Sequence, residues 1–436
     1  MVVALVAILL TAAACGSDSS SSSSTGSSAS STGASSGSEA AAAPCVADPE
    51  KVVAAGATPA STAALPADVV TQLDAAAQAS FKLAAAPGAI VGVRTPKGTW
   101  TSVYGTANPT LPVASPPTGP PMTPDMHTRI GSVTKTMTGT VILQLAQEGK
   151  LSLDDNIEKY VPGVPNGTTV TLRQLANMTS GIASYTRSTA FTGPFFSNPD
   201  TIFTPDQLLA IGVADSPSFP PGERFDYSNT NTVLLGMVIE KVTGQPVDQA
   251  FQQHIFGPLG MTNTSWPGTS TVIPDPHPQG FTLQGNTATP ENPSNATNWN
   301  PSWGWTAGEL ISSNADLLVY GRAIGTGKGL LDDKAQVERL ESFPGPAGYG
   351  LAMGCSEGWV GHTGELPGFN TSVFYDTSSD TTVVVQVNSD IASGSCSDSP
   401  TLNDDPREEV CSAPATRMFV ALSTALGHTF VPPPLH

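Results

Sequence analysis

From residue 129 the sequence reads Arg129-Ile130-Gly131-Ser132-Val133-Thr134-Lys135. Apolar residues then recur at helical spacing, at Met137, Val141, Ile142 and Leu145. The pattern predicts a helix that begins at Ser132 and ends near Gly149. In such a helix Lys135 lies one turn after Ser132, on the same face.

Ser132 and Lys135 are the residue types that nucleophilic catalysis needs. A serine hydroxyl reacts only when a base removes its proton, and a nearby lysine can do so where burial lowers its pKa. A helix N-terminus adds a positive field and free N–H groups for a developing oxyanion. Among the lysines of the chain, only Lys135 has a serine three positions before it. The structural alternative is that Ser132 caps the helix and Lys135 points into solvent.

A second block reads Phe219-Pro220-Pro221-Gly222-Glu223-Arg224-Phe225-Asp226-Tyr227-Ser228-Asn229. Its Pro-Pro-Gly sequence forces a turn, and an amphipathic pattern from Thr232 to Val242 predicts a helix after it. Tyr227 offers a phenol that can transfer protons, and Asn229 offers an amide that can hold a substrate carbonyl or Lys135. The structural alternative makes Ser228 or Asn229 the N-cap of that helix.

A third block reads Val360-Gly361-His362-Thr363-Gly364, and Glu365-Leu366-Pro367-Gly368-Phe369 follows it. It is typical of a glycine-containing edge strand, which lets a substrate backbone lie alongside and lends an N–H to an oxyanion. The structural alternative is that His362 marks a strand end at the surface.

The sequence around these blocks predicts strands and helices at both ends of the chain. Helical spacing predicts helices over residues 68–85 and 413–426. Strand patterns, each pair joined by a turn, cover residues 89–93, 99–104, 371–375 and 381–387. Because helices and proline-rich loops fill the middle, we expect an α+β fold, with a sheet that a helical insertion interrupts, rather than βαβ units.

We expect one globular domain over residues 65–430, with its α/β part over 65–150 and 300–430 and the helical insertion over 151–299. The composition supports a large core, since 39% of the 436 residues are hydrophobic. The 18 Lys and Arg against 36 Asp and Glu give a net charge of −18. Such a polyanion has no general attraction for nucleic acid or for an anionic membrane.

The N-terminus predicts export and a lipid anchor. An apolar run from Val2 to Leu10 is too short to span a bilayer and is typical of a signal peptide. Small residues precede Cys15, as in a bacterial lipobox, so residues 1–15 form the predicted leader and Cys15 the lipidation site. Residues 16–64, rich in Ser, Gly and Ala, are predicted to be a flexible tether. The alternative is an ordinary secretory signal in which Cys15 is incidental.

Four further cysteines fit an oxidising compartment. Cys396 and Cys411 bracket a polar loop, which favours pairing them and leaves Cys45 with Cys355, although three connectivities are possible. We expect neither a metal site nor a cofactor, because the chain has no Cys-x-x-Cys or His-x-x-x-His spacing.

Taken in order, Ser-x-x-Lys, Tyr-Ser-Asn and His-Thr-Gly resemble the motif series of the penicillin-recognising serine hydrolases, within them the D-alanyl-D-alanine carboxypeptidases and class C β-lactamase relatives. The resemblance extends over about residues 68–426. It also includes Thr171–Ile182, Pro258–Thr262, Ser302-Trp303, Thr306–Gly308 and Ile311–Ser313. It implies an α/β domain on an antiparallel sheet, an inserted all-α domain and an active site between them.

The resemblance also implies roles for individual residues. Ser132 would form the acyl-enzyme, and Lys135 and Tyr227 would share the proton transfers, with the base of each step left open. Asn229 would position the substrate amide and Lys135. The N–H groups of Ser132 and Glu365 would form the oxyanion hole, with substrate beside His362, Thr363 and Gly364. Trp303 would wall the cleft.

One departure bears on the substrate. Relatives commonly bind the free carboxylate of a peptide or antibiotic with a cation near the third motif, where this chain has His362. No Lys or Arg occurs between Arg339 and Arg407. A carboxylate would depend on Thr363, His362 and backbone donors, and Glu365 would repel it if its side chain faces the cleft.

We therefore expect a lipid-anchored, extracytoplasmic serine hydrolase that acts on D-Ala-D-Ala termini of cell-wall peptides. The departure near the third motif favours two alternative functions, a carboxylesterase and a peptidase acting on amidated or internal bonds. A β-lactam-binding protein with weak turnover and a catalytically silent binding protein are further alternatives. The expected partner is a small molecule or peptide, and the oligomeric state stays open.

Overall fold

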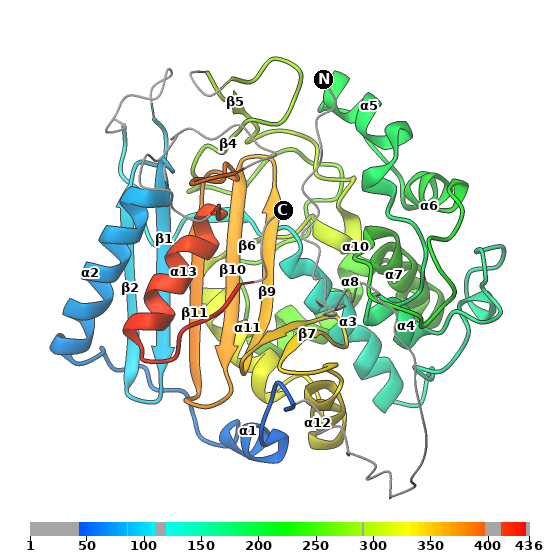
Figure 1. Cartoon of the computed structure of the whole chain (residues 1–436), viewed down its shortest axis with the longest axis horizontal. Coiled ribbons are helices and arrows are strands. Elements are labelled where there is room, and N and C mark those ends of the chain that lie inside the picture. The colour runs from blue at the N-terminus through cyan, green and yellow to red at the C-terminus, as the bar shows by residue number, and fades with distance from the viewer. Residues whose placement is uncertain (1–42, 85, 110–118, 290–291, 397–410, 433–436) are drawn as a thin grey trace, which may run out of the picture.

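The computed structural model describes residues 43–84, 86–109, 119–289, 292–396 and 411–432 (Figure 1). The predicted leader, with its lipidation site Cys15, lies outside these residues. Within the described part, no helix has the length and apolar character to cross a membrane.

A seven-stranded antiparallel sheet forms one half of the molecule (Figure 1). Its strand order is β2-β1-β11-β10-β9-β8-β7. The bounds are β1 Gly88–Thr95, β2 Gly98–Gly105, β7 Ala347–Tyr349, β8 Gly354–Ser356, β9 Trp359–Leu366, β10 Phe369–Asp376 and β11 Thr381–Val387. Strand β1 pairs with β11, with Ala89 opposite Val387, so the two ends of the chain build one sheet.

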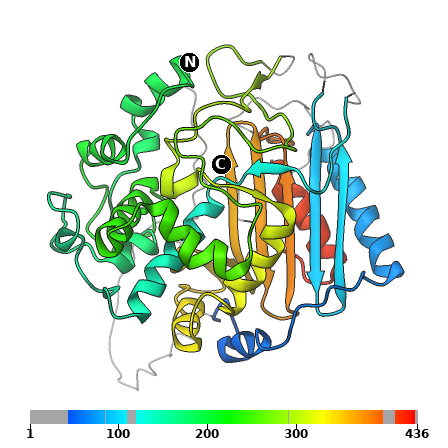
Figure 2. The same cartoon turned by 180° about the vertical axis from the view of Figure 1, so that it is seen from behind.

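Helices cover both faces of this sheet (Figures 1 and 2). Helices α2 (Ala67–Ala84) and α13 (Pro414–Ala425) lie on one face, and α11 (Asn314–Thr326) lies on the other. Burial on both sides explains the continuous β-branched run of β11. Val383 and Val385 pack in the cluster that contains Phe419 of α13, whereas Val384 belongs to the cluster of α11.

The other half of the molecule is mostly helical. Helix α3 (Val133–Gln147) lies between it and the sheet, and every residue from Val133 to Leu145 is buried. The remaining helical elements are η1 Ile157–Lys159, α4 Leu172–Ala176, η2 Tyr185–Arg187, α5 Thr189–Ser197, α6 Pro205–Ala214, α7 Asn229–Thr243, α8 Val247–Phe251, η3 Gln252–Phe256, α9 Gly257–Leu259, α10 Trp305–Gly308 and α12 Asp333–Glu341. Short strand pairs join β3 His127–Arg129 to β6 Ile311–Ser313, and β4 Phe281–Thr282 to β5 Ser294–Asn295.

These observations confirm the α+β class with an antiparallel sheet. The exact boundaries of the helical insertion stay a prediction. Both favoured disulfides are present, Cys45–Cys355 and Cys396–Cys411.

The predicted tether is wrong over its last part. Cys45 is buried in its disulfide, and helix α1 (Pro49–Ala55) begins next to it, with the side chain of Asp48 accepting from the N–H of Lys51. Helix α1 packs against α12 and α11. The low-complexity composition ends before this segment, and a bond to a residue 310 positions away fixes it on the domain.

Candidate active site

Ser132 lies at the start of α3, where Gly131 makes the turn. Gly131 has a φ of +52°, and a Cβ there would come within 2.5 Å of the backbone nitrogen of Glu365. Only glycine fits both the conformation and the space. The Ser132 hydroxyl makes no capping bond to the helix, so the structural alternative for this residue is wrong. It instead accepts a hydrogen bond from Nζ of Lys135 at 2.9 Å.

Lys135 is fully buried and forms no ion pair with any described residue. Its Nζ donates to Ser132 Oγ and, at 2.7 Å, to the carbonyl oxygen of Ala307 in α10. Burial lowers the pKa of Lys135 well below its ordinary value of 10.5, because desolvation disfavours the ammonium form. A neutral amine in contact with a serine hydroxyl can act as its general base.

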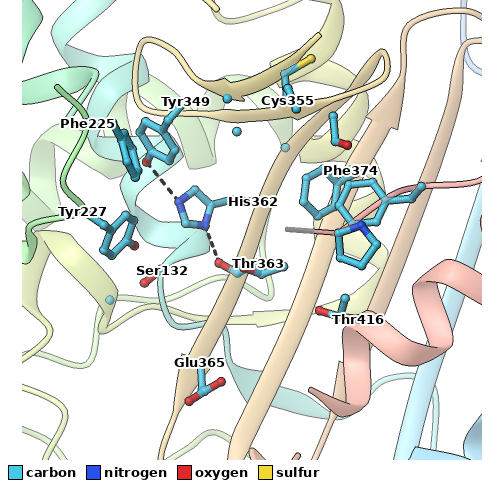
Figure 3. A pocket seen from close by; sticks show the side chains of 18 of the residues that line it. Ser132, Phe225, Tyr227, Tyr349, Cys355, His362, Thr363, Glu365, Phe374 and Thr416 are labelled. Atoms are coloured by element: carbon cyan, nitrogen blue, oxygen red, sulfur yellow. Dashed lines mark hydrogen bonds between the residues drawn. The ribbon is translucent and has the colours of Figure 1, made fainter. Parts of the chain in front are cut away.

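Tyr227 stands on the other side of the serine, just before α7. Its ring centroid lies 5.0 Å from Nζ of Lys135. Its buried hydroxyl has no hydrogen-bond partner among the described residues and lies near Ser132 (Figure 3). Burial raises the pKa of Tyr227 above its ordinary value, and the neighbouring Ser132 hydroxyl lowers it by less. The phenol therefore keeps its proton at neutral pH and can donate it.

Arg187 of η2 holds the turn that carries Tyr227. Its guanidinium donates to both carboxylate oxygens of Asp226, at 3.1 and 2.8 Å, and to the Tyr227 carbonyl at 2.8 Å. Bidentate pairs of this kind fix orientation as well as position. The sequence contains no local signal for this contact, because about 40 residues separate the partners.

Asn229 begins α7 and lines the same cavity as Ser132. Its Nδ2 donates to Thr186 Oγ1 at 3.0 Å, and its backbone N–H to Ser184 Oγ at 3.1 Å. The predicted contact with Lys135 is absent among the described residues. The lysine turns to Ala307 instead, because packed α10 brings a backbone carbonyl to it.

His362 of β9 is buried at 7% exposure, so its assignment to a surface strand end is wrong. Its Nδ1 bonds the carbonyl of Thr363, which can only accept, so Nδ1 carries the hydrogen. The bare Nε2 accepts from the Tyr349 hydroxyl at 3.1 Å. Burial, followed by the charge of Lys135, lowers the pKa of His362 to about 3. This histidine is neutral, and it orients Tyr349, whose part the motifs did not indicate.

Strand β9 runs directly beside the nucleophile. A Cβ at Gly364 would come within 1.8 Å of the Ile130 carbonyl oxygen and 3.1 Å of the Ser132 nitrogen. Gly364 therefore packs against the backbone of residues 130–132 and is not among the residues that line the cavity. Strand β8 pairs with β9 only from Trp359 to Gly361, so the following residues present a free edge on that side. No described residue accepts the N–H of Ser132, which leaves it available to an oxyanion.

One cavity of about 1270 Å³ joins these parts (Figure 3). It is lined by predicted site residues from both halves of the molecule: Ser132, Tyr227, Asn229, Trp303, His362, Thr363 and Glu365. Lys135 lies buried behind Ser132. The described residues contain no group of three His, Cys, Asp or Glu that is placed to hold a metal ion.

A sequence model of the beta-lactamase family matches residues 73–400. The chain belongs to this family. It is a serine hydrolase, which confirms the resemblance drawn from the three motifs.

Relatives of this beta-lactamase-family protein include a putative penicillin-binding protein, PbpX, of Bacillus subtilis. The two are 30% identical over 258 residues, which is 59% of this chain and 60% of PbpX. Protein flp of Staphylococcus aureus is 38% identical over 177 residues, 39% of this chain and 34% of flp. The chain thus matches less than two thirds of these relatives.

Solved structures give longer matches. A D-stereospecific amidohydrolase from Streptomyces sp. is 34% identical, with a TM-score of 0.65, over 72% of this chain and 94% of that one. A D-amino acid amidase from Ochrobactrum anthropi is 24% identical, with a TM-score of 0.68, over 83% of this chain and all of the other, a likeness that speaks for the fold alone.

Trp303 forms an aromatic wall of the cavity in this family member. Its ring packs against Phe191 and Phe195 of α5, with ring centroids 5.6 and 5.3 Å away. Its carbonyl accepts from the Tyr185 hydroxyl at 2.5 Å. These contacts fix the position of Trp303 on one side of the cavity.

Cations reach the cavity from segments far from the third motif. Arg187, Arg224 and Arg417 line it, although residues 340–406 contain no Lys or Arg. Arg187 is paired with Asp226, and Arg224 is paired with Glu223 and stacks over Phe219 at 4.1 Å. Arg417 donates to the side chain and carbonyl of Ser393. The stretch around the third motif contains no cation, but the folded cavity receives positive charge from these three arginines.

Proposed function

We propose that this protein is an extracytoplasmic hydrolase that cleaves the bond after a D-amino acid carbonyl through an acyl-enzyme on Ser132, with the D-Ala-D-Ala terminus of cell-wall peptides as its substrate. The observation that carries the proposal is the contact between buried Lys135 and Ser132 at 2.9 Å. This pair supplies a nucleophile and a base that needs no counter-ion.

Acylation follows from the geometry. Nζ of Lys135 takes the proton of Ser132 Oγ, and the oxygen attacks the substrate carbonyl carbon. The N–H of Ser132, together with that of Glu365 beside Gly131, stabilises the resulting oxyanion. The C–N bond breaks when the leaving nitrogen receives the proton of the Tyr227 phenol, and Lys135 returns a proton to the phenolate.

Deacylation reuses the same groups. A water molecule gives one proton to the neutral base, and its oxygen attacks the acyl carbon. The bond to Ser132 Oγ breaks, the serine oxygen takes a proton, and the product acid leaves. The opposite directions of the Lys135 and Tyr227 pKa shifts favour the lysine as base and the tyrosine as acid.

Two observations support an extracytoplasmic location. The protein has two disulfides, Cys45–Cys355 and Cys396–Cys411, as expected in an oxidising compartment. The apolar run before Cys15 is typical of an exported lipoprotein. We include the lipid anchor at Cys15 in the proposal.

Hydrolysis of a D-amino acid amide is the second candidate. A terminal carboxylate finds no lysine at the third motif, where His362 is neutral, and the D-stereospecific amidohydrolase from Streptomyces sp. is 34% identical to this chain. An amide has no such carboxylate to hold.

A substrate panel tests the proposal. The full chain is incubated with a diacetylated Lys-D-Ala-D-Ala peptide, D-phenylalanine amide and p-nitrophenyl acetate, with Ser132→Ala as control. We expect release of D-alanine from the peptide by the wild type alone. Ammonia release without D-alanine release selects the second candidate. Turnover of the ester alone contradicts both and identifies an esterase.

A further inference from the structure

The sheet side of the cavity holds a carboxyl group that the catalytic steps do not use. Glu365 follows the His-Thr-Gly motif on β9, and its side chain lines the cavity (Figure 3). Only its backbone N–H has a part in the proposed mechanism. Its side-chain oxygens form no hydrogen bond or ion pair with any described residue, which is unusual for a half-buried carboxyl.

Asp390, beyond the end of β11, is a second acid near Glu365 and lies behind the cavity lining. It is buried, and three donors satisfy its oxygens: Thr282 Oγ1 at 2.8 Å, Gln284 Nε2 at 2.7 Å and the Gly368 N–H at 3.1 Å. Burial raises the pKa of both acids, and Asp390 raises that of Glu365 further. The fixed donors keep Asp390 in place, so Glu365 is the member that is free to meet a ligand.

Glu365 is also close to the reacting bond. Its backbone nitrogen and oxygen lie within 2.5 and 2.9 Å of the position of a Cβ on Gly131, the residue before the nucleophile. Thr363, two residues earlier on the same strand face, lines the same cavity. A substrate acylating Ser132 therefore lies beside the backbone of Glu365, whose side chain lines the cavity that the substrate enters.

We propose that Glu365, backed by Asp390, binds an ammonium group on the acyl part of the substrate, and so selects amino-acid amides, esters or peptides with a free amine over N-acylated ones. The ammonium supplies the hydrogen-bond donors that the Glu365 carboxyl lacks among the described residues. The inference rests on the proposed acyl-enzyme chemistry at Ser132, and within it favours the second candidate, a D-amino acid amide, over N-acylated cell-wall peptides.

Binding to the Ser132→Ala chain tests the inference separately from catalysis. Calorimetry at about pH 7.5, where an α-amino group is largely charged and Glu365, with a pKa that burial raises to about 8, is partly ionised, compares D-phenylalanine amide with N-acetyl-D-phenylalanine amide. We expect the free amine to bind about tenfold more tightly or better, as a charge-assisted hydrogen bond provides. Adding Glu365→Gln should reduce the ratio of the two Kd values to about one.

Glu357→Gln is the matched control. Glu357 lines the same cavity but is exposed in the turn between β8 and β9, so this substitution should leave the ratio unchanged. An equal or weaker affinity for the free amine, no binding of either ligand, or a ratio that survives Glu365→Gln overturns the inference. Failure of the wild type to cleave any substrate instead overturns the proposed function, whatever the Kd ratio.

Discussion

The helical wall of the cavity is formed by Ser132 and Tyr227, with the buried amine of Lys135 behind them. The sheet wall is formed by His362 and Glu365, with the buried carboxyl of Asp390 behind them. Neither Lys135 nor Glu365 has a counter-ion among the described residues. Burial lowers the pKa of Lys135 and raises that of Glu365, so both groups are pushed toward their neutral forms.

The walls differ in how these groups are held. Lys135 has two fixed partners, Ser132 Oγ and the Ala307 carbonyl, so it is oriented before any substrate arrives. Glu365 has no hydrogen-bond partner within the described part of the chain. A catalytic base such as Lys135 works best when it is already oriented, whereas the unpaired Glu365 carboxyl can form hydrogen bonds with a ligand. The comparison assigns chemistry to the helical wall and selection to the sheet wall.

The largest effect should come from Lys135→Met. Loss of the base should lower kcat/KM on the order of 10³-fold. The same change should raise the melting temperature at pH 7, because it removes a buried amine. The unfolded chain binds this proton up to about pH 10.5, whereas the folded chain releases it well below, so wild-type stability rises with pH across that interval.

Thermal melts at pH 7 and at about pH 10 check this sign. The stability gain of Lys135→Met should be larger at pH 7 and should shrink as the pH approaches the ordinary lysine pKa. A variant that is less stable than the wild type at pH 7, or that keeps full activity, would contradict the role given to the helical wall.

Tyr227→Phe should have the next largest effect. The ring keeps its edge-on contact with Tyr349, with 6.1 Å between centroids, but the proton donor is lost. Amide hydrolysis should fall about 10²-fold, while p-nitrophenyl ester hydrolysis should fall much less, because nitrophenolate leaves without a proton. Steady-state kinetics on both substrates measure the difference. Equal losses on the two substrates would show that the Tyr227 phenol is not the proton donor to the leaving group.

His362→Asn should have the smallest effect, on stability in acid. The unfolded histidine takes up its proton near pH 6.5, and the folded one only at about pH 3. The free energy of unfolding of the wild type should therefore decrease as the pH is lowered from 6.5 to about 3, by up to about 1.4 kcal/mol per pH unit. Urea unfolding across this range should show a shallower fall for the variant. Parallel pH profiles for the two proteins would mean that His362 is not the buried neutral group of the sheet wall.

The sequence predicts what depends on local patterns. The run at Thr381–Val387 gives β11 with its bounds, and apolar spacing after Ser132 gives α3. The order of three short motifs identifies the family. Ser132, Tyr227 and His362, one from each motif, line one cavity, as the resemblance implies. These features could be predicted because each is encoded within a few neighbouring residues.

What the sequence does not predict depends on contacts between distant segments. The Ala307 carbonyl that binds Lys135 lies 172 residues away, and Arg187 meets Asp226 across 39 residues. Charge along one segment did not reveal the arginines that line the cavity from α13 and η2. Polar contacts of this kind are set by how whole elements pack, so a local pattern carries no record of them.

The central claim is that Ser132 carries the acyl group. The most direct measurement is the intact mass of the folded full-length protein after incubation with a fluorescent penicillin and, separately, with a p-nitrophenyl ester. We predict a covalent adduct on the wild type that peptide mapping places at Ser132 and that Ser132→Ala abolishes. The absence of an adduct with both probes, or an unchanged adduct on Ser132→Ala, would contradict the account.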